Sequence, residues 1–319
     1  MRRIAVFALA LVLTASGAVP QGHVEDFPAR PIRLIIGFPP GSAADITARL
    51  VGNVMSETLG QQIVIEARPG AGSSIAAEFV ARSAADGYTL YIGTSSNVTN
   101  QVTNANLHFD FAKDFAAVTP LTALPLILAV HPSLGVGSFE ELVALARSRP
   151  GEITYASVGV GTTPHLACEL IGARLHLRLV HVPYQGSPPA VTDLLAGRVS
   201  FMLGVASTIM PHVAAGRLKA LASGSGKRPQ IAPDIPTLAE AGLPDFDATV
   251  WFGLVAPAGT PRPIIDRLAD AANAALKSDD VAAKLRKQGF EPLGGTPDEF
   301  TGFIARETGK WAAAAGMRK

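Results

Sequence analysis

Residues 32–45 read IRLIIGFPPGSAAD, and the fold follows from this stretch. Its first seven residues form a short apolar run, which is typical of a strand buried in a parallel sheet. A Pro-Pro-Gly sequence ends the run, and Ser42 and Asp45 then have the spacing of a capping box, which marks a helix start. The stretch therefore predicts a strand, a tight loop and a helix N-terminus in direct succession.

The same alternation continues along the chain. Apolar residues recur at helical spacing up to Gly60, and residues 62–67 form a second expected strand. A helix over residues 73–84 and a strand over residues 88–94 follow. This β-α-β-α-β order predicts a parallel sheet with helices on its faces.

A second α/β unit is expected between residues 139 and 223, where four strands alternate with helices. Residues 248–256 form a further expected strand, and three helices without intervening strands follow it. We expect these helices to pack on the first sheet, so that the chain leaves the first domain and returns to it. The predicted division is domain 1 at residues 27–122 plus 250–319 and domain 2 at residues 123–249, with crossings near residues 118–130 and 248–256.

The N-terminus has the features of a secretory signal peptide, predicted at residues 1–18. Met1, Arg2 and Arg3 are a basic start, ten apolar residues follow, and small residues precede a cut after Ala18. Ten apolar residues are too few to cross a bilayer, which needs about 20. No other stretch is long enough to do so. We expect a mature protein that is periplasmic and not embedded in the membrane.

The charge pattern excludes nucleic acid as a partner. The formal net charge is only +1, whereas phosphate binding needs a basic field. Lys and Arg are scattered and form no cluster of the kind that binds anionic lipid.

Sequence signatures of catalysis, nucleotide binding and metal binding are missing. There is no Gly-x-Ser-x-Gly elbow, Walker A loop or His-Glu-x-x-His. Residues 159–164 begin like a dinucleotide fingerprint, but Pro164 replaces its third glycine. His165 and Cys168 share a helix face, yet two ligands are too few for zinc. We predict no catalytic residue, metal or cofactor, and a buried structural role for Cys168, the single cysteine.

Four loops rich in glycine and hydroxyl groups follow predicted strands, at residues 38–45, 94–97, 157–163 and 184–187. In open α/β sheets, ligands bind beyond the carboxyl ends of the strands. Helix N-termini there offer unpaired N–H groups and a positive dipole end, which suit an anion. None of the four loops contains Lys or Arg. Each loop alone could be an ordinary helix cap, but together they predict a small anion held by neutral donors.

Several long segments resemble one family, the tripartite tricarboxylate transporter substrate-binding proteins, also called the Bug family of periplasmic receptors. The resemblance covers residues 27–311 and includes FPARPIRLIIGFPPG, YASVGVGTTPHLACEL, HVPYQGSPPAVTDLLAG and WFGLVAPAGTP. The chain departs from the family pattern at Ser42, where a second glycine is usual. It departs again at Gly204-Val205, where an Asp-Asn pair is common, which favours a less polar or bulkier acid.

The resemblance implies a two-domain periplasmic binding-protein fold, type II-like, with a ligand cleft between the domains. It also implies a small carboxylate ligand held by loop backbone groups and bridging waters. Asp45 is expected to cap its helix and shape the loop. The loops and the resemblance together predict these ligand-binding residues: Phe38, Pro40, Gly41, Ser42, Ala43, Asp45, Thr94, Ser95, Ser96, Ser157, Gly161, Thr162, Thr163, His165, Tyr184, Gly186 and Gly204.

The leading functional hypothesis is a monomeric receptor that delivers an organic acid to membrane transporter subunits. One alternative is a sensory receptor that presents its closed form to a membrane kinase, and the sequence does not separate the two. Another is a periplasmic enzyme on the same scaffold, which would need a nucleophile with a base in reach, or a metal.

Overall fold

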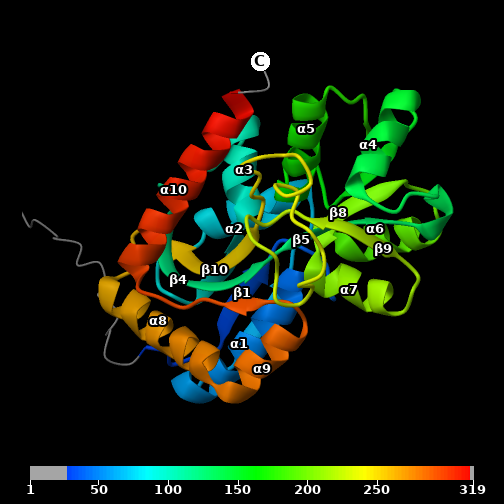
Figure 1. Cartoon of the computed structure of the whole chain (residues 1–319). Coiled ribbons are helices and arrows are strands. Elements are labelled where there is room, and N and C mark those ends of the chain that lie inside the picture. Colours follow the sequence, from blue (N-terminus) through cyan, green and yellow to red (C-terminus); the bar gives the residue numbers. More distant parts are fainter. Residues whose placement is uncertain (1–26, 317–319) are drawn as a thin grey trace, which may run out of the picture.

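A computed structural model describes residues 27–316, which form two β-sheets with helices on their faces (Figure 1). The predicted signal peptide at residues 1–18 lies outside the described residues. Among the described helices, none is both long enough and apolar enough to cross a membrane.

Sheet A has six strands in the order β11-β4-β10-β3-β1-β2. β1 is parallel to both β2 and β3, which confirms the parallel unit predicted from residues 32–94. β10 is antiparallel to β3 and to β4, and β11 is antiparallel to β4 at the edge. The strands are β1 (Ile32–Ile36), β2 (Ile63–Ala67), β3 (Thr89–Thr94), β4 (Phe115–Leu124), β10 (Val250–Pro257) and β11 (Glu291–Pro292).

Sheet B has five strands in the order β7-β6-β8-β5-β9. β6 is parallel to β7 and β8, whereas β5 is antiparallel to β8 and β9. All five residues of β5, LILAV, are buried, because helices cover both faces of this strand. The strands are β5 (Leu126–Val130), β6 (Thr154–Ser157), β7 (Val180–Pro183), β8 (Phe201–Val205) and β9 (Lys219–Ser223).

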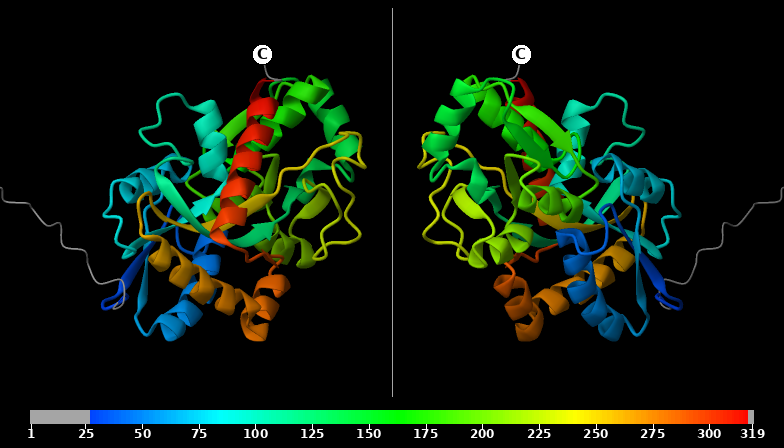
Figure 2. Two further views of the ribbon diagram at one scale, coloured as in Figure 1. Left: turned by 90° about the vertical axis from the view of Figure 1, so that its left-hand side faces the viewer. Right: turned by 90° about the vertical axis from the view of Figure 1, so that its right-hand side faces the viewer.

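Helices cover both faces of each sheet (Figures 1 and 2). On sheet A, α1 packs against α8 on one face, and α10 packs against α3 on the other. The helices of this part are α1 (Ala43–Leu59), α2 (Ser74–Ala81), α3 (Ser95–Thr103), α8 (Arg262–Lys277), α9 (Asp279–Lys287) and α10 (Pro297–Gly316), with the 3-10 turn Ala71–Ser73. Those around sheet B are α4 (Phe139–Ser148), α5 (Thr163–Leu175), α6 (Ser187–Leu195) and α7 (Ala206–Ala214), with the 3-10 turn Pro132–Leu134.

The chain passes between the sheets at two places. β4 runs to Leu124 and β5 begins at Leu126, so the first passage falls on Pro125, the single residue between the two strands. On the return, the Ala248 N–H donates to the carbonyl of Gly224 beside sheet B, and Val250 opens β10 in sheet A. The two halves of the chain are therefore joined by two single-strand connections.

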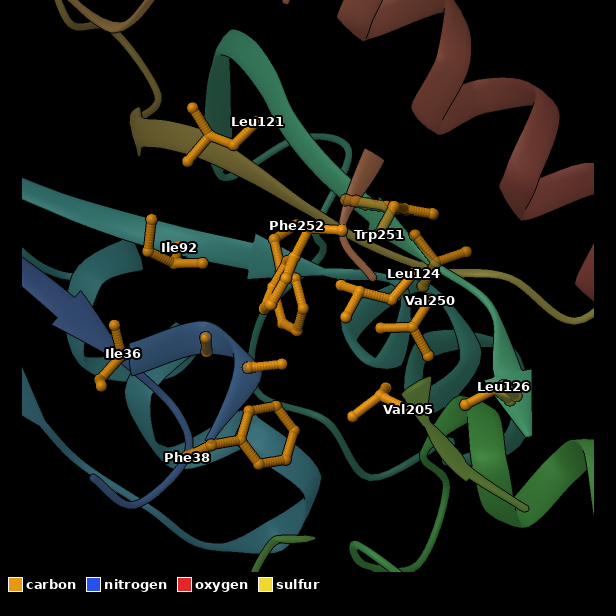
Figure 3. Close-up of a cluster of buried hydrophobic side chains, with 14 of the residues drawn as sticks. Ile36, Phe38, Ile92, Leu121, Leu124, Leu126, Val205, Val250, Trp251 and Phe252 are labelled. Carbon is orange, nitrogen blue, oxygen red and sulfur yellow. The ribbon is translucent and has the colours of Figure 1, made fainter. Parts of the chain in front are cut away.

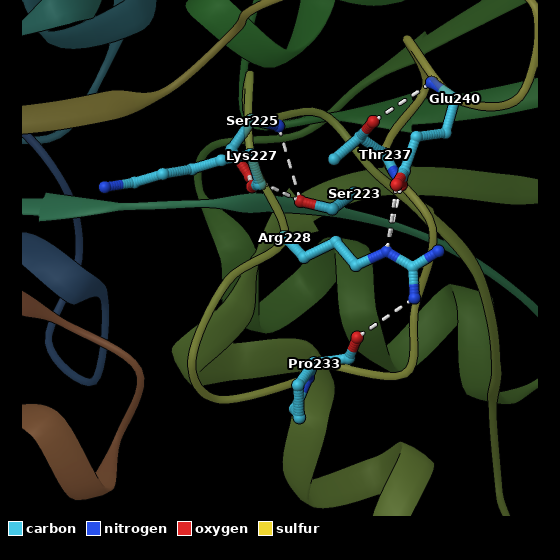
Figure 4. A network of polar contacts seen from close by, with 7 residues as sticks. All are labelled: Ser223, Ser225, Lys227, Arg228, Pro233, Thr237 and Glu240. Atoms are coloured by element: carbon cyan, nitrogen blue, oxygen red, sulfur yellow. Dashed lines mark hydrogen bonds and ion pairs between the residues drawn. The ribbon is translucent and has the colours of Figure 1, made fainter.

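The segment between β9 and β10 lacks regular structure and is held by polar contacts (Figure 4). The Ser223 and Ser225 hydroxyls are 2.7 Å apart. Arg228 pairs with the Glu240 carboxylate at 3.0 Å, and that carboxylate also accepts the Thr237 N–H at 2.7 Å. These bonds replace the sheet and helix bonds that the segment lacks.

The sequence did not predict α3 or β11, nor the two strands β4 and β5 that flank Pro125. Residues 95–103 (SSNVTNQVT) have little apolar periodicity, because α3 packs between other elements through buried polar side chains. β4 reads FAAVTPLTAL, and its internal Pro120 argues against a central strand. Pro120 is accommodated by a register shift in the pairing with β10.

Candidate functional site

Five helix N-termini meet between the two sheets around a cavity of about 30 Å³, which we call the central cavity. They belong to α1 and α3 from sheet A and to α5, α6 and α7 from sheet B. Figure 3 shows Phe38 and Phe252 facing each other across this space, with Val205 and Val250 beside them. The wall consists of Phe38, Ser42, Ala43, Ala44, Thr94, Ser96, Val158, Pro164, Ser187, Val205, Val250 and Phe252.

The N-terminus of α1 keeps its donors free. The Ser42 hydroxyl accepts the N–H of Asp45, and it retains its own proton for donation. Ala43 and Ala44 open the helix, so their N–H groups have no intrahelical acceptor. No other acceptor binds these two groups within the described chain.

Asp45 stabilises the loop that precedes α1. Its carboxylate accepts the Gly41 N–H at 3.0 Å and lies 3.0 Å from the Arg49 guanidinium. Gly41 has φ +77°, a left-handed conformation that favours glycine. Asp45 is not on the cavity wall, and its contacts support the predicted role in shaping the loop.

The N-terminus of α3 is built by a capping box of Thr94 and Asn97. The Thr94 hydroxyl accepts the Ser96 N–H at 3.1 Å, and the Asn97 side chain accepts the Thr94 N–H at 3.0 Å. The Tyr91 hydroxyl donates to Asn97 at 3.0 Å and lies 2.5 Å from the Ser73 hydroxyl; burial raises the pKa of Tyr91. This buried network fixes the direction of the Thr94 loop.

The helices from sheet B offer fewer donors. Pro164 occupies the second position of α5, and Pro188 and Pro189 the second and third positions of α6, so these residues have no N–H. The Ala206 N–H of α7 already donates to the carbonyl of Pro125 at 3.0 Å. On this side the Ser187 hydroxyl is the one side-chain donor on the described cavity wall.

Two buried hydrogen bonds join the halves beside the central cavity. The Thr99 hydroxyl donates to the Gly161 carbonyl at 2.6 Å, and the Thr163 hydroxyl donates to the Ser95 hydroxyl at 2.8 Å. Gly72 is needed at this contact, because a Cβ there would lie 2.9 Å from the Val160 carbonyl oxygen. The halves therefore fit closely in this arrangement.

The loop before α5 rests on two stacked histidines. The Gly161 N–H donates to Nδ1 of His165 at 3.1 Å, and the Ser157 hydroxyl lies 2.6 Å from Nε2 of His181. The two imidazole rings stack at 4.1 Å, and Tyr155 stacks on His181 at 4.9 Å. Burial lowers the pKa of His181, although the charge of nearby Glu169 opposes this.

The predicted site residues fall into three groups. Phe38, Ser42, Ala43, Thr94 and Ser96 line the central cavity. Phe38, Gly161, His165 and Tyr184 line a larger hollow of about 710 Å³ on the other side of the loop at residues 157–163. The remaining residues are on neither wall: Pro40, Gly41, Asp45, Ser95, Ser157, Thr162, Thr163, Gly186 and Gly204.

Sequence reasoning missed several residues of the central cavity. Val205 lines it, whereas Gly204 points a Cβ position towards Ile209 in the core. Successive side chains of β8 point to opposite faces of the sheet, so Val205 faces the cavity while the Cβ position of Gly204 faces the core. The other missed wall residues are Ala44, Val158, Pro164, Ser187, Val250 and Phe252.

Two larger hollows lie away from the five helix ends. One, of about 640 Å³, adjoins Pro125 and the loop at residues 225–231, and the other, of about 760 Å³, lies against α8 and α9. The small central cavity is the candidate site, because residues from the predicted loops of both sheets line it.

The described residues contain no group of three or more His, Cys, Asp or Glu side chains placed to hold a metal ion. Cys168 is fully buried in α5, and burial raises the pKa of its thiol, which makes it a poor nucleophile. Its burial agrees with the structural role predicted for it.

The fold and the cavity define a solute-binding protein of the two-domain periplasmic type. Residues 47–316 match the model of the tripartite tricarboxylate transporter family receptor, and the chain belongs to this family. BugT of Bordetella pertussis is 37% identical over 313 residues, which are 98% of this chain and 95% of BugT.

Solved structures agree with this assignment. An R. palustris protein solved with adipate is 36% identical with a TM-score of 0.88, over 92% of this chain and 98% of that chain. MatC from Rhodopseudomonas palustris with bound malate is 32% identical with a TM-score of 0.86, over 90% and 99% of the two chains. The predicted family, fold class and receptor function are thereby confirmed.

Proposed function

We propose that this receptor binds the carboxylate of a small organic acid in the central cavity and delivers the acid to membrane transporter subunits. The observation that supports this most is the convergence of five helix N-termini on a cavity whose described wall carries no charged side chain. Unpaired N–H groups and hydroxyls at helix N-termini stabilise an anion. The adipate and malate of the two structural relatives are both carboxylates.

We propose that the acid enters by hinge rotation. A cavity of about 30 Å³ has room for one or two water molecules, so an organic acid requires the halves to separate. The proposed bodies are residues 27–122 plus 250–319 and residues 123–249, which rotate about the passages at Pro125 and before Val250. Closure would then form the Thr99–Gly161 and Thr163–Ser95 bonds.

We propose further that the mature protein is a periplasmic monomer without catalytic turnover. The described wall of the central cavity has no Asp, Glu, His, Lys or Cys. The cavity therefore offers no general base and no activated nucleophile. The N-terminal sequence supports export, which mass spectrometry of the periplasmic fraction tests through a mature start near Val19.

Calorimetry with an organic acid and its amide tests the carboxylate hypothesis. A thermal-shift screen of organic acids first identifies the best ligand, because a bound ligand raises the unfolding midpoint. The amide should bind at least about 100-fold more weakly, because its NH₂ group presents donors to donors. Affinity should change little between low and high salt, since the contacts are buried. Equal binding of the amide would refute the proposal.

A further inference from the structure

We infer that the central cavity selects a monocarboxylate with a compact apolar body and rejects dicarboxylates. This inference rests on the proposed carboxylate function and adds the chemical class of the ligand. It follows from which parts of the wall still have donors to offer.

Two buried serines on the cavity wall have hydroxyls without a partner. Ser96 in α3 is 2% exposed and Ser187 in α6 is 6% exposed, and neither hydroxyl has a hydrogen-bond partner among the described residues. Both hydroxyls open onto the cavity, where water or a ligand oxygen can pair with them. They therefore add two side-chain donors to the N–H groups of the helix ends.

The remaining donors gather on the sheet A side. Ser42, Thr94 and Ser96 place three hydroxyls there, and the free N–H groups of Ala43 and Ala44 lie beside Ser42 at the start of α1. A carboxylate accepts about four hydrogen bonds, which this side supplies. We assign the ligand carboxylate to the sheet A side.

The rest of the wall cannot satisfy a second carboxylate. Val158, Pro164 and Val205 come from sheet B and its helices, and Val250 and Phe252 from β10. Val205 and Val250 are 7% and 5% exposed, so water does not solvate this part of the wall freely. Ser187 gives its hydroxyl and the N–H that opens α6, which are two donors where a carboxylate accepts about four hydrogen bonds, so a second carboxylate stays largely unpaired.

Matched pairs of acids test the inference. Calorimetry on protein purified from the periplasm compares butyrate with succinate, hexanoate with adipate, and benzoate with terephthalate. Within the pair that binds best, the monocarboxylate should bind at least about 10-fold tighter, because its partner buries an unpaired charge. A dicarboxylate that binds as tightly as its monocarboxylate overturns the inference and leaves the carboxylate function intact. If no acid binds, the proposed function fails, and the inference fails with it.

Variants locate the selectivity. Val205→Asn adds a donor to the apolar wall and should narrow the ratio between the two acids by at least about threefold. Val64→Asn makes the same change on the exposed edge strand β2 and should leave the ratio unchanged. Val205→Thr also adds a hydroxyl donor but keeps the shape of the side chain, and it replaces Val205→Asn in the test if that variant does not fold. An unchanged ratio in the folded Val205 variant overturns the assignment of this wall.

Discussion

Helix N-termini form both sides of the central cavity, but the two sides differ in how many hydrogen-bond donors they leave free. On the sheet A side, the N–H groups of Ala43 and Ala44 at the start of α1 and the hydroxyls of Ser42 and Ser96 stay available. On the sheet B side, the first turns of α5 and α6 contain Pro164, Pro188 and Pro189, which have no N–H. A helix end therefore binds an anion only where its sequence leaves donors free.

A negative charge on the sheet A side should have the largest effect. Ala44→Asp places a carboxylate in the first turn of α1, where it would take the donors and repel an anionic ligand. Affinity for the best acid should fall by more than about 100-fold, as measured by calorimetry. Ala258→Asp, at an exposed position after β10, makes the same change in net charge and should have no effect. Normal binding to Ala44→Asp would place the carboxylate elsewhere.

The two unpartnered serines offer a matched test of the two sides. Ser96→Ala removes a donor on the sheet A side and should weaken binding by about 10-fold, since a hydrogen bond to a charged group contributes about 1.5 kcal/mol or more. Ser187→Ala removes the equivalent hydroxyl on the sheet B side and should weaken binding by less than about threefold. Neither hydroxyl has a partner in the described chain, so thermal stability should not fall. A larger loss of affinity in Ser187→Ala than in Ser96→Ala would place the carboxylate on the sheet B side instead.

Breaking a bond between the halves should weaken binding more modestly. Thr99→Val removes the donor to the Gly161 carbonyl and should reduce affinity about three- to tenfold, because the closed form becomes less populated. Thr103→Val removes a bond to the Thr99 carbonyl within the same helix and is the control. X-ray scattering with saturating acid should show less compaction in Thr99→Val than in the unaltered protein. Equal compaction and affinity would show that this contact does not contribute to closure.

The smallest expected effect is the pH dependence from His181 on the sheet B side. Burial lowers the pKa of His181 in the folded protein, so near and below pH 6.5 the unfolded chain binds more protons than the folded protein. This contribution to stability is complete above that pH and is lost as the pH falls. The unfolding midpoint should drop by about 2 °C between pH 7.5 and 5.5. His181→Gln should reduce this drop, whereas His108→Gln at an exposed site should not.

Much of the fold could be predicted because its strands and helices have clear periods. The apolar run at residues 32–36 and the capping box at Ser42 gave β1 and the start of α1 correctly. α3 escaped prediction because its buried face is polar, with Ser95, Asn97 and Asn100 all buried. Tertiary hydrogen bonds stabilise that helix, and a hydrophobic pattern does not report them.

The sequence by itself determined the order of elements, the family and the loops that end the parallel strands. These depend on local chemistry: apolar runs, proline and glycine positions, and helix caps. Only the tertiary structure decided that Val205 and Ser187 lie on the cavity wall while Gly204, Ser157 and Thr162 do not. The face a residue presents depends on the pleat of its strand and on how the two sheets pack, and neighbours far apart in the sequence set both.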